Sequence, residues 1–132
     1  MTTRATGPFA VKLNPLQAYD NSEGSPMSRM SIDKEFTGDL QATSKGEMLA
    51  TNVRDKGSGV YVAIERVTGT LGGRTGTFVL HHTGIMTRGT PQLTIKVAPD
   101  SGTGELTGIT GNMAIVIEAG KHSYEFDYAI PE

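Results

Sequence analysis

Seventeen glycines divide the 132 residues into short stretches rich in Val, Ile, Thr, Phe and Tyr, and this spacing constrains the fold more than any other feature. Glycine supplies the positive φ angles of tight turns at little steric cost, whereas β-branched and aromatic residues favour strands. No stretch of ten or more residues keeps the 3.6-residue period of an amphipathic helix. The chain is therefore predicted to be all-β.

Alternation of apolar and polar residues predicts eight strands. They cover residues 9–14, 27–36, 40–49, 59–69, 74–86, 93–97, 113–118 and 121–130. A chain of this length forms one domain, residues 1–132, which is large enough to bury a hydrophobic core. We expect residues 1–7 to be disordered and residues 16–28 to form a long polar loop.

Tight turns fix the pairing of several of these strands. The glycine pair at 72–73 favours a type I′ turn, which aligns Glu65 with Leu80 and Ala63 with His82. A second tight hairpin joins the last two strands. Several hairpins in series, with no helix long enough to cover a sheet, favour a sheet that closes on itself and so loses its edges. We predict a single closed antiparallel barrel of about eight strands, which is either filled by side chains or holds one small ligand.

Three phrases from residue 28 onward carry a resemblance: SRMSIDKEFTGDLQATSKGEML, YVAIERVTGTLGGRTGTFVLHHTG and PDSGTGELTGITGNM. They resemble a bacterial family of uncharacterised domains (domain of unknown function) that is classed with the allene oxide cyclase-like barrels. Residues 102–111 are similar to a glycine-rich segment of allene oxide cyclases and plant dirigent proteins, with Leu106 where those families prefer an aromatic residue. The resemblance implies a small closed β-barrel and a small-molecule ligand, and it implies no reaction.

Charge and composition argue against several classes of partner. A net charge of −2, with acidic and basic residues interspersed, provides no basic face for a nucleic acid or a lipid surface. No run approaches membrane-spanning length and no signal peptide is recognisable, so the expected location is cytoplasmic. The absence of cysteine and the spacing of the three histidines indicate no metal site, and nothing indicates a cofactor. The segment 102–111 lacks the Lys-Ser/Thr ending of a phosphate-binding loop and is expected to be a turn that closes the barrel.

The adjacent histidines are the most conspicuous candidates for chemistry. Successive strand residues point to opposite faces, so His81 and His82 cannot share one pocket. The hairpin register places His82 on the same face as Glu65. If that face is inward, Glu65 and His82 form a partly desolvated carboxylate–imidazole pair suited to general acid–base catalysis on an apolar substrate. The alternatives are a structural pair that satisfies a buried charge, or an inverted barrel with Arg66 and His81 inside.

Further residues are candidates for lining a ligand cavity. Arg88, on a loop at one end of the barrel, suits an anionic head group such as a carboxylate, against the alternative of a solvated loop arginine. Aromatic residues that alternate along the last strand provide either cavity lining or core packing. The predicted ligand-binding residues are Tyr61, Phe78, Leu80, Arg88, Tyr124, Phe126 and Tyr128.

Three functions are compatible with these features. The leading hypothesis is a binding protein for a small apolar or carboxylated ligand inside the barrel. The others are an isomerase or cyclase that uses Glu65 and His82, and a structural or interaction protein with a filled barrel. The outward apolar face of the central hairpin would be covered by self-association, so we expect a homo-oligomer. The residues of this face are Val60, Val62, Ile64, Val79 and Ile85.

Overall fold

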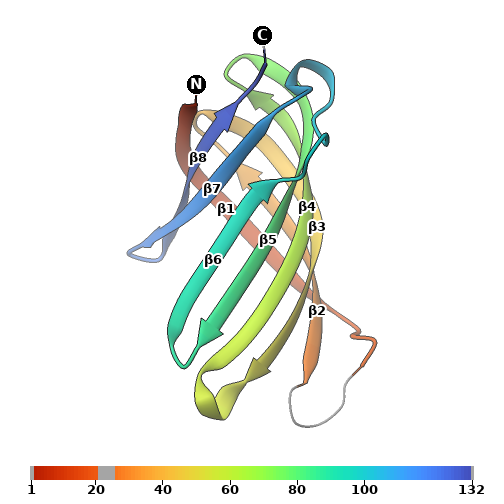
Figure 1. The fold of residues 1–132 in the computed structure, drawn as a ribbon, viewed down its shortest axis with the longest axis vertical. Coiled ribbons are helices and arrows are strands. Elements are labelled where there is room, and N and C mark those ends of the chain that lie inside the picture. Colours follow the sequence, from red (N-terminus) through yellow and green to blue (C-terminus); the bar gives the residue numbers. More distant parts are fainter. Residues whose placement is uncertain (1, 21–25, 132) are drawn as a thin grey trace.

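The computed structural model describes residues 2–20 and 26–131, and they form one closed antiparallel barrel (Figure 1). Its strands are β1 (Thr3–Leu16), β2 (Met27–Phe36), β3 (Leu40–Val53), β4 (Ser58–Leu71), β5 (Arg74–Thr87), β6 (Thr90–Val97), β7 (Thr110–Glu118) and β8 (Lys121–Ala129). Each strand pairs with the next, and β8 pairs with β1 to complete the ring. The predicted all-β fold and the eight-stranded barrel are confirmed.

Within residues 2–20 and 26–131, two short 3₁₀ helices lie between strands: η1 (Arg54–Lys56) and η2 (Gly104–Leu106). No helix among the described residues is long and apolar enough to cross a membrane.

The register of the central hairpin is the predicted one. Glu65 pairs with Leu80, and Ala63 pairs with His82. Gly72 and Gly73 have φ angles of 58° and 81°, the left-handed conformation that both central residues of a type I′ turn require. The turn chemistry therefore decides which side chains of β4 and β5 face the interior.

The prediction that residues 1–7 are disordered is wrong for residues 3–7. These residues begin β1 and pair with β8, from Thr3 opposite Tyr128 to Pro8 opposite Ser123. They are ordered by a strand that lies at the other end of the sequence, so local composition does not reveal the pairing. The predicted loop at 16–28 is shorter, because β1 ends at Leu16 and β2 begins at Met27; residues 21–25 lie outside the described residues.

One end of the barrel is packed with buried side chains. Both chain termini lie at this end (Figure 1). The segment between β6 and β7 covers this end with Leu106 and Ile109, which are both buried in the core. Thr103 anchors the segment to β5, since its backbone N–H donates to the Thr77 carbonyl at 2.8 Å. The segment 102–111 thus closes the barrel, as expected. The buried core of this end comprises Ala5, Phe9, Phe36, Leu40, Ala42, Val67, Leu71, Phe78, Leu80, Ile95, Val97, Leu106, Ile109, Met113, Tyr124 and Phe126.

The opposite end, where β3 meets β4 and β5 meets β6, is open. Strand pairing is incomplete here: β6 pairs with β7 only at Ile95–Met113 and Lys96–Asn112, and the pairing of β1 with β8 stops at Pro8. Inward-facing apolar side chains of this half are 37–46% exposed instead of packed. They are Val11, Leu13, Met86 and Leu93. The barrel is therefore filled at one end and hollow at the other.

The outer face of the central hairpin carries the apolar side chains that the sequence places there. Val60, Val62, Ile64 and Ile85 are exposed, and Val79 is half-buried. The expected homo-oligomer stays a prediction.

Candidate functional site

A cluster of four polar side chains lies inside the barrel, where the packed end meets the hollow end. Glu65 on β4 and His82 on β5 face the interior, as the hairpin register predicts, and Lys34 on β2 and Ser44 on β3 join them. All four are buried, and the Glu65 side chain is fully shielded from solvent. Because buried charge is costly without partners, the contacts within this cluster decide what it can do.

Glu65 is the centre of the cluster. Its Oε2 lies 2.9 Å from the Lys34 ammonium, and its Oε1 accepts a hydrogen bond of 2.7 Å from the Ser44 hydroxyl. His82 Nε2 lies 2.5 Å from Oε2, but it makes no aligned hydrogen bond to it or to any other described residue. The predicted contact between Glu65 and His82 is thus present, together with two partners that the sequence does not reveal.

Lys34 is held by aromatic rings as well as by the carboxylate. Its Nζ lies 5.4 Å from the centre of the Phe9 ring and 5.8 Å from that of Phe36. A cation over an aromatic face is attracted by the ring quadrupole. The ammonium therefore has three favourable neighbours in an otherwise apolar interior.

These contacts set the protonation of Glu65. Burial by itself would raise its pKa, but the contact with His82 and the positive charge of Lys34 outweigh burial and lower the pKa to about 2. Glu65 is accordingly ionised at neutral pH, with its charge balanced by Lys34. A carboxylate that accepts a proton only near pH 2 is poorly matched to general-base catalysis at neutral pH. Lys34 and Glu65 have the properties of a buried ion pair.

Lys34 and Ser44 are the members that sequence reasoning misses. A signal for both exists, because each is a polar residue in a line of inward-facing positions. Lys34 follows Met30 and Ile32 on the inner face of β2. A polar residue on the apolar face of an alternating strand requires a buried partner.

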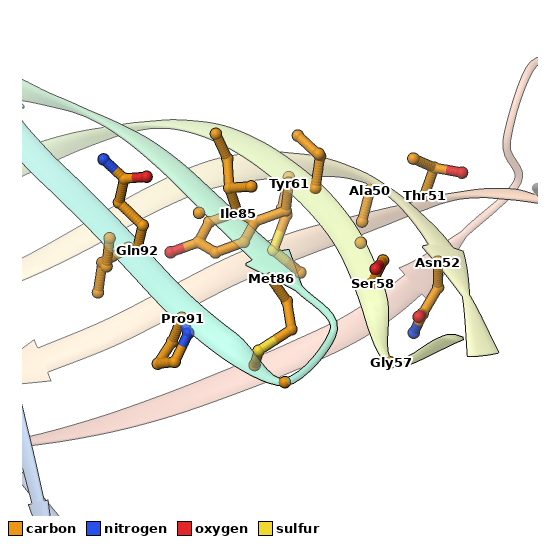
Figure 2. A pocket seen from close by; sticks show the side chains of 16 residues that line it. Ala50, Thr51, Asn52, Gly57, Ser58, Tyr61, Ile85, Met86, Pro91 and Gln92 are labelled. Carbon is orange, nitrogen blue, oxygen red and sulfur yellow. The ribbon is translucent and has the colours of Figure 1, made fainter. Parts of the chain in front are cut away.

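A cavity of about 610 Å³ occupies the open end of the barrel (Figure 2). Its inward-facing lining is predominantly apolar, from Met48 and Ala50 on β3, Tyr61 on β4, Gly84 and Met86 on β5, and Pro91 and Leu93 on β6. Its rim includes Gly57, directly after η1, and Gly89 in the turn between β5 and β6. A volume of this size is within the range of small-molecule sites.

Tyr61 connects the cavity with the polar cluster. Its ring lies 6.4 Å from the His82 ring, centre to centre, and packs on the backbone of Gly84. Burial, and secondarily the charge of Glu65, raise the pKa of the Tyr61 hydroxyl. Tyr61 is therefore a neutral phenol that borders the hollow space.

Of the predicted ligand-binding residues, Tyr61 lines the cavity, and the others lie elsewhere. Phe78, Leu80, Tyr124 and Phe126 are buried in the packed end, and Tyr128 is half-buried beside Phe126. The Tyr124 hydroxyl accepts a hydrogen bond from the Leu40 backbone and donates one to the Thr37 carbonyl. Arg88 is exposed in the turn between β5 and β6, at the open end, where its backbone N–H donates to the Ser58 hydroxyl.

The two adjacent histidines serve different surfaces, as alternation predicts. His82 is buried, whereas the His81 side chain is on the outer face, in the row of Ile64 and Lys96. A hollow of about 700 Å³ lies along this outer face, bordered by His81, Leu49, Val62 and Ile64. Within the described residues, no three His, Asp or Glu side chains are grouped to share a metal ion.

Comparisons with known proteins agree with this geometry. A crystal structure of a protein with unknown function from the DUF3224 family, from Shewanella oneidensis MR-1, is 51% identical and superposes with a TM-score of 0.95 over 100% of this chain and 99% of that one. A search of curated proteins gives no match. The family model described as "Protein of unknown function (DUF3224)" matches residues 5–128. The chain therefore belongs to the DUF3224 family.

Proposed function

We propose that the barrel binds a small apolar molecule in the cavity of its open end. The observation that carries this proposal is the apolar lining of a hollow of about 610 Å³. Protein interiors are normally close-packed, and unfilled apolar space costs stability. Here Met86 and Leu93 face into the barrel and remain 41% and 44% exposed. A ligand in the cavity would cover these side chains.

The alternative of an isomerase or cyclase has less support. Glu65 and His82 are in contact beside the cavity, which favours it. Lys34 and Ser44 each bind one oxygen of the carboxylate, however, and the pKa of about 2 leaves little basicity. We therefore place the binding function first and treat the cluster as a structural ion pair.

We also propose that this family belongs with the allene oxide cyclase-like barrels. The closed ring of eight antiparallel strands and the glycine-rich segment that covers the packed end support the assignment. This kinship concerns architecture and carries no reaction.

Fluorescence titration with N-phenyl-1-naphthylamine, a neutral apolar probe, tests the binding function. We expect saturable binding of one probe per barrel. Ala50→Trp fills the cavity from β3 and should abolish binding, whereas Ala114→Trp introduces the same side chain at an exposed, outward position of β7 and should leave it unchanged. Absence of saturable binding to the unmodified protein, or equal effects of the two variants, would overturn the proposal. Native mass spectrometry of freshly purified protein would identify a retained natural ligand.

A further inference from the structure

The Tyr61 hydroxyl is an unused hydrogen-bonding group in the cavity. No hydrogen bond joins it to another residue of the described ranges 2–20 and 26–131; its neighbours are the His82 ring and the charge of Glu65. The other polar lining groups lie toward the rim, where Asn52 and Gln92 are exposed to water. Figure 2 shows the Tyr61 ring among the lining side chains. Tyr61 is half-buried, and a ligand that displaces water from the cavity would have to supply the partner that its hydroxyl then needs.

The described lining of the cavity offers no charge to a ligand. Among the residues of 2–20 and 26–131 that are placed along it, none is charged. Lys34 and Glu65 are buried in the interior and paired with each other at 2.9 Å, and Lys56 and Arg88, which precede the rim residues Gly57 and Gly89, are exposed to water. An ionised ligand would lose its hydration without gaining a counter-ion, which is strongly unfavourable. An uncharged ligand avoids this cost.

From these observations we infer that the ligand is an uncharged apolar molecule with one hydrogen-bond acceptor, such as a ketone or aldehyde oxygen, that receives a hydrogen bond from the Tyr61 hydroxyl. This inference rests on the proposed binding function and specifies its ligand class. This ligand class differs from the carboxylated ligand that the sequence also suggested. Arg88, the residue predicted to bind such a carboxylate, lies on an exposed turn.

The surroundings of Tyr61 suit a donor role. Burial raises the pKa of the Tyr61 hydroxyl, so the phenol is protonated at neutral pH and can donate a hydrogen bond. The backbone of Gly84 also holds the ring in place. The ring packs so closely on this residue that a Cβ at Gly84 would lie 2.2 Å from Cε1 of Tyr61. A donor held in place loses little conformational freedom when the ligand binds.

Three naphthalene probes of similar shape test the inference: 2-acetylnaphthalene, which has a ketone; 2-isopropylnaphthalene, which has no acceptor; and 2-naphthoate, which is charged. We expect the ketone to bind most tightly and 2-naphthoate most weakly. Tyr61→Phe keeps the ring and removes the donor. It should weaken the ketone about three- to tenfold, as for one neutral hydrogen bond, and leave the affinity of the hydrocarbon unchanged.

Tyr19→Phe makes the same change at a fully exposed tyrosine and is the matched control. Thermal unfolding of each variant verifies that the fold is retained. If no probe binds, the proposed function fails. If both neutral probes bind and Tyr61→Phe weakens neither or both equally, only the inference about the ligand class fails. Tightest binding of 2-naphthoate, with loss in Arg88→Ala, would overturn it in favour of a carboxylated ligand.

Discussion

The ring of Tyr61 packs on Gly84, so closely that a Cβ at Gly84 would lie 2.2 Å from Cε1 and 2.6 Å from Cδ1. The two residues are neighbours on β4 and β5, where Tyr61 pairs directly with Gly84. The absence of a side chain at residue 84 is what allows the ring to lie along the wall and leaves the cavity free.

A methyl group at residue 84 should therefore close the cavity. In Gly84→Ala, the displaced ring is the end of a flexible side chain and can move into the hollow. We expect the affinity for N-phenyl-1-naphthylamine to fall severalfold, while the free energy of unfolding changes by less than about 1 kcal/mol. Titration and urea unfolding measure the two quantities on the same preparation. Undiminished affinity would show that the ring does not border the binding space.

Gly46→Ala provides the contrasting case. A Cβ at Gly46 would lie 2.1 Å from the Ile64 carbonyl oxygen and 2.6 Å from the Cα of Glu65. These are backbone atoms of the paired strand, which cannot move without disrupting β3 and β4. We expect a loss of about 2–3 kcal/mol in the free energy of unfolding, measured by urea denaturation. A loss no larger than that of Gly84→Ala would contradict this reading of the packing.

Removal of the Lys34 ammonium should destabilise the barrel through Glu65. In Lys34→Met the carboxylate remains buried without its cation, which typically costs about 3–5 kcal/mol. The double variant Lys34→Met/Glu65→Met removes both charges and should recover most of this loss. Urea unfolding of the single and double variants gives the coupling between them. If the loss of stability in the double variant equals the sum of the losses in Lys34→Met and Glu65→Met, the two side chains do not depend on each other.

Glu65 should also make the stability depend on acid pH. Its pKa is about 2 in the folded protein and about 4.5 in the unfolded chain, so the unfolded state binds the proton first. Stability from this group is complete above about pH 5 and is lost as the pH falls toward 2, by about 3 kcal/mol in all. The ionisable groups that face Glu65 are Lys34 and His82.

Urea unfolding between pH 2 and pH 6 measures this effect. The difference between the unmodified protein and Glu65→Gln isolates it, because the exposed carboxylates Glu47 and Asp127, whose pKa values their arginine partners lower, are common to both. The difference should shrink as the pH falls. A difference that is constant with pH would mean that Glu65 titrates alike in both states.

One charged substitution tests self-association through the outer face of the central hairpin. Ile64 is 63% exposed between Glu47 and His81 in its cross-strand row. We expect Ile64→Lys to shift the protein toward the monomer in sedimentation velocity, because burial of a lysine at an apolar contact is unfavourable. Ala114→Lys on β7 should leave the sedimentation unchanged. A monomer for the unmodified protein at every concentration would remove the expected homo-oligomer.

Local chemistry made much of the fold predictable. The glycine pair at 72–73 fixes a turn type, the turn type fixes the register, and the register places Glu65 and His82 together on the inner face. The start of β1 could not be predicted in this way, because residues 3–7 are ordered by β8, more than a hundred residues further along the chain.

The division of the barrel into a packed and a hollow end was also beyond the sequence. Alternation shows that Phe78 and Tyr61 both point inward, but it does not show how far along the barrel axis each one lies. Phe78 stacks on Phe126 at 5.6 Å in the packed end, whereas Tyr61 borders the cavity. Likewise, the distance from Lys34 to Glu65 depends on the stagger of β2 against β4 around the ring, which no single hairpin determines.

Leu106 and Ile109 cover one end of the barrel, so the interior is a tube that is closed at this end. A guest molecule and its replacement would both have to pass through the open half, which includes the Arg88-Gly89 turn. Exchange would then begin with departure of the first occupant, so its rate would stay constant however much competitor is added.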